Sequence, residues 1–256
     1  AVDLPGNASA LAAAGPRAPP ATGRKVTVGD LQKEARVPLD RTRVPFLPAS
    51  RGAAFPIQGG GALQALRWMM QKSELKQDMF LLGEPGPELR HLVCLYCVLL
   101  GKELEYVAIT RDTSEADLKQ RREIVGGCLE YVDQAPVSAA KHGRVLLLEG
   151  IEKAERNVLP TLNNLLENRE MALEDRTFLA APHRAKDLGG VEGHVIVSEN
   201  FEVIAIGQPS RGNPLDPPLR SRFVAFEVRP RALRGSAEEE LTRLAQCTVG
   251  TSDPPF

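Results

Sequence analysis

Short apolar runs alternate with amphipathic stretches along most of the chain. Runs of this length are typical of buried strands, and they stand at residues 79–82, 105–110, 145–149, 201–206 and 223–228. Apolar residues at helical spacing predict helices at residues 62–73, 89–100, 114–125, 137–142 and 157–170. Alternation of this kind predicts an α/β fold, in which a parallel sheet carries helices on both faces.

The two ends of the chain depart from this pattern. Residues 1–25 are rich in Ala, Gly and Pro and hold little that can pack, so we expect them to be disordered. Prolines interrupt residues 26–57, which we expect to wrap around the core as an arm. The core is expected to extend over residues 26–228, and residues 229–256 to form a divergent tail with one helix near 238–246.

Composition narrows the possible partners. The net charge is −1, so nothing in the sequence forms the broad basic field that nucleic-acid binding requires, and we expect no nucleic-acid partner. No apolar run approaches the roughly 20 residues that span a bilayer, so we expect no membrane span. Cys94 and Cys97 form a C-x-x-C pair inside an apolar helical pattern that lacks a second ligand pair, and we interpret them as core residues.

A glycine-containing loop follows the first apolar run. A loop between a strand and a helix is typical of phosphate binding, because its backbone N–H groups point toward the ligand. In such loops a Lys reaches the β and γ phosphates, and a Ser or Thr hydroxyl binds Mg²⁺. Here Leu89 stands at the Lys position, Arg90 follows it, and the charge of Glu88 would repel phosphates. The candidate phosphate loop comprises Gly83, Glu84, Pro85, Gly86, Pro87, Glu88, Leu89, Arg90 and His91.

Polar residues also follow two later strands. Glu149 ends an apolar run, where a carboxylate that holds Mg²⁺ or its bound water belongs. Gly150 stands at the next position, where a Glu would polarise the attacking water, and Glu152 is expected to point elsewhere. Gln208 follows another strand and could orient water or contact the γ phosphate.

Two arginines precede the last predicted strand. Arg220 and Arg222 lie in a short turn, a position that suits an arginine finger supplied to the site of a neighbouring subunit. The alternative interpretation is that both are ordinary surface charges.

Taken in order, these motifs resemble the AAA+ ATPase core of the MoxR and dynein-related branch. The resemblance covers about residues 26–228. It rests on the loop and on L-L-L-E-G, F-E-V-I-A-I-G-Q-P and P-L-R-S-R-F, together with the longer phrases T-S-E-A-D-L-K-Q-R-R-E and E-K-A-E-R-N-V-L-P-T-L-N-N-L-L-E-N-R-E. The fold that it implies is a three-layer P-loop NTPase core with a parallel sheet.

The resemblance also implies an activity. It implies a mitochondrial ATPase whose modules or subunits assemble in a ring, with ATP and Mg²⁺ bound between them. Under this resemblance the candidate phosphate loop binds ATP, Glu149 is the metal-site acid and Gln208 the sensor. Arg222 is the first candidate for the finger and Arg220 the second. Residues 171–200 correspond to an insertion after the second helix, which we expect to form a hairpin or loop.

The chain departs from the family pattern in four places. The loop Lys, the loop Ser/Thr and the catalytic Glu are absent, and the helical lid is largely absent because only residues 224–256 follow Phe223. The first residue is Ala and the lid is short, so we expect a processed or truncated form, such as a short isoform. Two hypotheses remain: an ATP-binding module whose hydrolysis is slow or partner-dependent, and a scaffold that needs no nucleotide.

Overall fold

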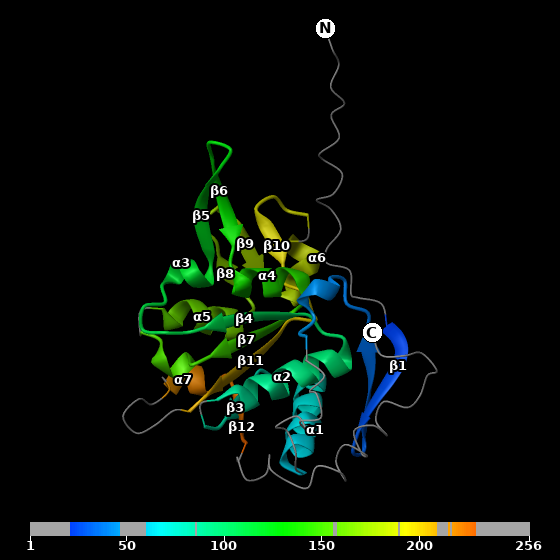
Figure 1. The fold of residues 1–256 in the computed structure, drawn as a ribbon. Helices are drawn as coiled ribbons and strands as arrows, with labels where there is room; N and C mark the ends of the chain where they lie inside the picture. Colours follow the sequence, from blue (N-terminus) through cyan, green and yellow to red (C-terminus); the bar gives the residue numbers. More distant parts are fainter. Residues whose placement is uncertain are drawn as a thin grey trace.

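A five-stranded parallel sheet forms the centre of the computed structural model (Figure 1). The structure describes residues 21–46, 60–84, 86–155, 158–188, 190–208, 215 and 217–228. In spatial order the strands are β12 (Val224–Glu227), β3 (Met79–Leu82), β11 (Glu202–Gly207), β7 (Val145–Glu149) and β4 (Leu104–Ala108). All neighbouring pairs are parallel, so the predicted parallel sheet is confirmed.

Helices cover both faces of this sheet. Within β7, Leu146 and Leu148 face one apolar core, whereas Val145 and Leu147 face the other, as the alternation of strand side chains requires. One face carries α1 (Gly60–Glu74) and α2 (Pro87–Leu100) (Figure 1). The other carries α3 (Glu115–Leu118), α4 (Ala135–His142), α5 (Leu159–Glu167) and α7 (Pro217–Arg220). Three layers result, which explains why the central strands are almost wholly apolar.

Helix α2 follows the candidate phosphate loop and packs along one apolar stripe. Its buried residues recur at helical spacing and are Leu89, Leu92, Val93, Tyr96, Cys97 and Leu100. Burial raises the pKa of the Cys97 thiol, and Cys94 is partly buried, so both cysteines belong to the packing as predicted. The helix ends at Leu100 and is capped by Gly101, whose φ of 63° lies in the left-handed region.

An antiparallel hairpin joins the core at the start of the described chain. It consists of β1 (Ala21–Val28) and β2 (Leu31–Arg36), and Val26, Val28 and Ala35 pack against α1 and α2. The prediction of disorder is therefore wrong for residues 21–25, because these residues belong to β1 and its ladder with β2. The prediction for residues 1–20 lies outside the described residues.

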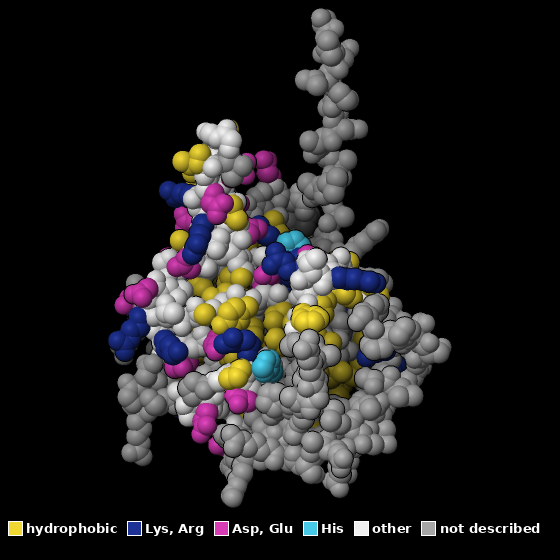
Figure 2. Space-filling view, viewed as in Figure 1, with side chains coloured by type: hydrophobic (Ala, Val, Ile, Leu, Met, Phe, Trp, Pro, Cys, Tyr) yellow, Lys and Arg dark blue, Asp and Glu magenta, His cyan; other side chains and the backbone are white. Residues whose placement is uncertain are grey.

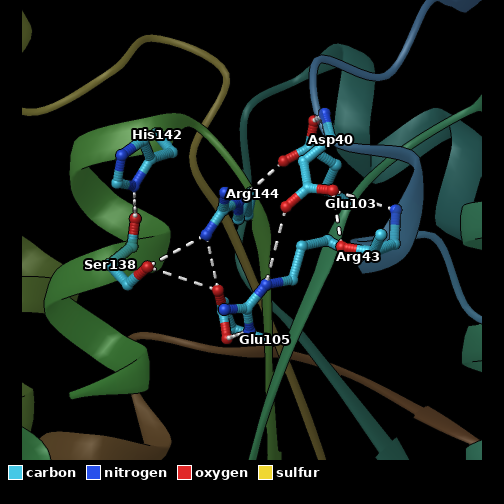
Figure 3. Close-up of polar contacts among 8 residues, drawn as sticks. Asp40, Arg43, Glu103, Glu105, Ser138, His142 and Arg144 are labelled. Carbon is cyan, nitrogen blue, oxygen red and sulfur yellow. Dashed lines mark hydrogen bonds and ion pairs between the residues drawn. The ribbon is translucent and has the colours of Figure 1, made fainter.

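Ion pairs tie this hairpin to the sheet (Figure 3). After β2, the backbone N–H of Asp40 donates to Glu103 at 2.8 Å, and Arg43 of the short η1 (Arg41–Arg43) pairs with Glu105 at 3.2 Å. Arg144 lies 2.7 Å from each of the same two carboxylates. The predicted arm is thus anchored where β4 and β7 begin.

A second hairpin replaces the end of a predicted helix. Helix α3 stops at Leu118, and β5 (Gln120–Val125) pairs with β6 (Cys128–Asp133) in a hairpin that projects from the body (Figure 1). The prediction of a helix over residues 114–125 is wrong beyond α3. Gly126 and Gly127 have φ angles of 59° and 85°, which the two-residue turns of tight hairpins require and which glycine adopts freely.

The insertion predicted at residues 171–200 forms a small sheet. β8 (Met171–Ala172) and β9 (Phe178–Ala180) make the expected hairpin, and β10 (His194–Ile196) adds a parallel third strand. The links are the short η3 (Pro182–Arg184) and α6 (Ala185–Leu188). Gln120 of the projecting hairpin donates to Asp175 at 3.0 Å, so the two insertions are joined.

The remaining surface has two plain features. Acidic and basic side chains are interspersed over the face that Figure 2 shows, and hydrophobic side chains lie on its upper projection, where Ile124 and Leu129 of the β5–β6 hairpin are exposed. Within the described part of the chain, no helix combines the length and apolar character that crossing a membrane needs. The predicted tail at residues 229–256, with its helix, lies outside that part.

Candidate functional site

Three strand ends meet at one edge of the sheet. The candidate phosphate loop follows β3, Glu149 ends β7 and Gln208 follows β11, the strand between them. The backbone N–H of Gly83 donates to the carbonyl of Gly207 at 3.2 Å, which holds the loop beside Gln208. Ligands of open α/β sheets bind at the carboxyl ends of the strands, so this edge is the candidate site.

Arg90 and Glu149 form a two-pronged ion pair at this edge. Arg90 lies in the first turn of α2; its Nε donates to Oε2 of Glu149 and its Nη2 donates to Oε1, each at 3.0 Å. Paired bonds of this kind are strong and fix the planes of both groups. In active loops, the position of Arg90 carries a hydroxyl that binds the metal. Here it carries a guanidinium, which contacts the Glu149 carboxylate directly.

Tyr106 of β4 completes this cluster, and the sequence reasoning missed it. Its hydroxyl donates to Oε2 of Glu149 at 2.7 Å, and the Arg90 guanidinium lies 5.4 Å from its ring centroid. Partial burial acts to raise the pKa of Glu149, but the hydrogen bonds from Arg90 and Tyr106 outweigh it and lower that pKa below its ordinary value. Only the register that pairs Tyr106 with Leu147 would have revealed this contact.

Two loop residues have roles other than phosphate binding. Leu89, at the Lys position, is 5% exposed and belongs to the core, where it lies against Gly83. Glu88 folds back over the loop, since a Cβ on Gly86 would lie 2.5 Å from its Oε2. The Glu88 carboxylate therefore lies close to the N-terminus of α2, an end of a helix that favours anions.

The other loop residues are less informative. Glu84 and Pro87 are exposed, His91 is partly buried and Pro85 lies outside the described residues. Their expected part in nucleotide binding stays a prediction.

Gly150 adopts a conformation that suits glycine. Its φ is 78°, and a Cβ there would lie 3.0 Å from the carbonyl oxygen of Ile109. Glu152, in the short η2 (Ile151–Lys153), turns its carboxylate against Gly207, so the expectation that it points away from the site is wrong. Its Oε2 is buried without a hydrogen-bond partner in the described part of the structure, next to the exposed Gln208.

The two candidate finger arginines lie away from the chain's own loop. Val224 pairs with Met79, so Arg220 and Arg222 stand near the amino end of β3, whereas the loop follows its carboxyl end. Arg220 is exposed at the end of α7. Neither arginine therefore lies at the chain's own loop, and a role at the site of another subunit stays a prediction.

The residues fit the two expected cofactors unequally. For phosphates, the N-terminus of α2 and the glycines of the loop keep the required backbone features. Mg²⁺ does not fit at Glu149, because Arg90 and Tyr106 already engage both carboxylate oxygens.

Comparison with known proteins defines the class. The profile of the AAA domain, dynein-related subfamily, matches residues 78–223, which is more than half of the chain. The chain belongs to this family and is an AAA+ ATPase module, as the motifs predicted.

Particular relatives narrow the class further. The chain is 50% identical over 220 residues to von Willebrand factor A domain-containing protein 8 of Mus musculus. The matched region covers 81% of this chain and 11% of that protein. It is 28% identical over 182 residues to protein NorQ of Paracoccus denitrificans (strain Pd 1222), covering 66% of this chain and 62% of NorQ. The chain thus spans less than two thirds of either relative.

Solved structures support the fold alone. A "putative ATPase" from Cytophaga hutchinsonii ATCC 33406 superposes with a TM-score of 0.51 over 75% of this chain and 51% of its own, at 14% identity.

Proposed function

We propose that this chain is an ATP-binding AAA+ module whose own site hydrolyses ATP slowly or only with the help of a partner. The observation that carries the proposal is the Arg90–Glu149 ion pair. It engages both oxygens of the carboxylate that would otherwise assist hydrolysis. The loop Lys and the Glu expected at position 150 are missing as well. Loss of one transition-state group typically costs about 10²- to 10³-fold in rate, so two such losses make hydrolysis by this site alone very slow.

The remaining residues account for binding. Backbone N–H groups at Gly86 and in the first turn of α2 would hold phosphate oxygens, and the helix dipole would favour their charge. The exposed amide of Gln208 would contact the terminal phosphate or a nearby water. Gly150 has no side chain to accept a proton from that water. ATP binding is therefore expected to remain although hydrolysis is impaired.

The setting of the module is part of the proposal. AAA+ membership supports assembly with other AAA+ modules or subunits in a ring, where Arg220 or Arg222 would reach the nucleotide of a neighbour. We further propose a mitochondrial location, which the family resemblance implies. Fractionation of cells that express a tagged chain tests that location, and recovery outside mitochondria would refute it.

A scaffold without nucleotide is the second candidate. The observation in its favour is the Glu88 carboxylate over Gly86, which places a negative charge at the mouth of the candidate phosphate loop. Under this alternative the α/β core serves only assembly.

Isothermal titration of the full chain with ATP separates the two candidates. The proposal predicts binding of one ATP per chain and a higher melting temperature, since a ligand at 100 times its Kd adds roughly 2.7 kcal/mol of stability. Arg90→Ala should weaken the binding, and Arg122→Ala on the projecting hairpin serves as the matched control. Absence of binding at millimolar ATP would favour the scaffold.

A further inference from the structure

We infer that the guanidinium of Arg90 takes the place of the divalent cation at Glu149, so that this site binds a metal-free nucleoside triphosphate. The inference rests on the proposed function, because it concerns how the same site binds its nucleotide. It starts from the disagreement between the family's usual metal requirement and the residues around Glu149.

The ion pair leaves Arg90 able to bind a second anion. A guanidinium has five N–H donors, and two of them, one on Nε and one on Nη2, are used by Glu149. Among the described residues, no partner uses the donors of Nη1 or the second donor of Nη2. Arg90 can therefore bridge the Glu149 carboxylate and a phosphate, which is the part that a bound metal ion and its water take in active sites.

The neighbours of Arg90 hold it in this bridging position. The Tyr106 hydroxyl shares Oε2 of Glu149 with Arg90, and the tyrosine ring lies beneath the guanidinium. The Arg90 side chain is nevertheless 46% exposed, so its free edge is open to a ligand. A metal ion would have to displace the guanidinium and the hydroxyl, and Mg²⁺ in addition demands near-octahedral oxygen ligands.

Charge balance gives the same result. Arg90 neutralises Glu149, whereas Glu88 and Glu84 remain in the loop. The triphosphate must therefore be held by the free donors of Arg90 and the N-terminus of α2. Added Mg²⁺ should therefore gain no contact with the protein, because the Glu149 carboxylate is already paired with Arg90.

The test compares ATP binding to the full chain in EDTA and in excess Mg²⁺. We expect equal affinities for the natural sequence. Arg90→Thr restores a hydroxyl and frees Glu149, and should bind ATP more tightly in Mg²⁺ than in EDTA, by about 5- to 150-fold if the coupling is ordinary. Arg122→Thr, an exposed arginine of the β5–β6 hairpin, should behave as the natural sequence does.

The outcomes separate this inference from the proposed function. Tight binding to the natural sequence only in Mg²⁺ would overturn the inference and leave the ATP-binding module intact. No binding in either buffer would overturn both. If Arg90→Thr does not fold, Glu149→Gln replaces it: the inference predicts that this variant still binds ATP equally in both buffers, and a metal dependence found in the natural sequence but lost in this variant would refute it.

Discussion

Arg222 is bound to Glu167 of its own chain. The guanidinium pairs with this α5 carboxylate and donates to the carbonyl of Pro218, and the Arg222 side chain is only 19% exposed. Arg220 lies two residues earlier, at the exposed end of α7, and its side chain makes no hydrogen bond or ion pair with another described residue. Of the two candidate fingers, Arg220 is thus the one that could reach a neighbour without breaking an internal contact.

The two arginines should therefore differ when they are removed. Arg222→Ala should lower the stability of the chain by about 1 kcal/mol, because it frees a partly exposed ion pair and a backbone carbonyl. Arg220→Ala should leave thermal unfolding unchanged and reduce any hydrolysis that depends on a partner subunit. Equal melting temperatures for both variants would show that the Arg222–Glu167 pair contributes nothing.

Glu88 should limit nucleotide affinity. Its carboxylate lies over Gly86 at the start of α2, where a phosphate would bind. Glu88→Gln removes the charge and keeps the shape, so ATP should bind more tightly, by about tenfold if 1.4 kcal/mol of repulsion is relieved. Glu130→Gln, an exposed change on the β5–β6 hairpin, is the control. Calorimetric titration measures both, and an unchanged affinity for Glu88→Gln would place the phosphates elsewhere.

Restoring the catalytic glutamate should not restore hydrolysis. Gly150→Glu forces a side chain into the left-handed region, at a cost of about 1 to 2 kcal/mol, and against the carbonyl of Ile109. Denaturant unfolding should therefore show a less stable chain. Hydrolysis should stay at the background rate, since Arg90 still occupies Glu149. A stable and active Gly150→Glu chain would contradict this account of the site.

The buried ion pair between Lys102 and Glu202 of β11 should make the folded chain sensitive to the loss of either charge. Lys102 bonds Glu202 and the Tyr96 hydroxyl, and its side chain is 4% exposed. Glu202→Leu leaves Lys102 buried without its counter-charge and should cost roughly 3 to 5 kcal/mol. Adding Lys102→Met should recover most of that loss, which urea unfolding of the single and double variants measures. Failure of the double variant to recover would mean that packing, and not charge, carries the effect.

The same pair gives the stability a pH dependence. Burial acts to raise the pKa of Glu202, but Lys102 and Ser73 lower it below its ordinary 4.5, so the folded state releases this proton more readily than the unfolded state. The resulting stabilisation is complete above pH 4.5 and is lost as the pH falls through the folded pKa. The Lys102→Met/Glu202→Leu chain should lose less stability in that window. If the stability of both chains fell equally with pH below 4.5, the pH dependence would not come from Glu202.

Gln120 should hold the two insertions together. It is 2% exposed, donates to Asp133 at 2.8 Å and to Asp175 at 3.0 Å, and accepts from the Asp175 N–H at 3.1 Å. Gln120→Ala should cost about 1 to 3 kcal/mol and speed hydrogen exchange in β5, β6 and β9, with β7 and β11 unchanged. The exposed pair of Arg122 and Glu174 is the control, because Arg122→Ala should cost at most about 1 kcal/mol.

The sequence predicted the sheet well because its signal is local. Strand β7 is a run of Val and Leu that only a covered sheet buries, and its observed bounds match the predicted residues 145–149. Helical spacing predicts one helix over residues 114–125, but α3 ends at Leu118. Gly126 and Gly127 supply the positive φ angles of a tight hairpin turn, and this turn chemistry favours β5 and β6 over a longer helix.

The site was predicted in part for a different reason. Adjacent parallel strands bring the loop, Glu149 and Gln208 to one edge, and this follows from the order of the motifs. The partnership of Arg90 with Tyr106 does not follow, because it depends on the register of β4 against β7. Tertiary packing determines which residues of separate elements come into contact, and a single sequence does not predict that packing.

The most direct test of the account is a single-turnover assay with the full chain in excess over γ-labelled ATP. The account predicts that the label stays on the protein as intact ATP over roughly seconds, the time in which a typical enzyme turns over. Stoichiometric release of phosphate by the isolated chain within that time would contradict it, because the site would then hydrolyse ATP efficiently with Arg90 paired to Glu149.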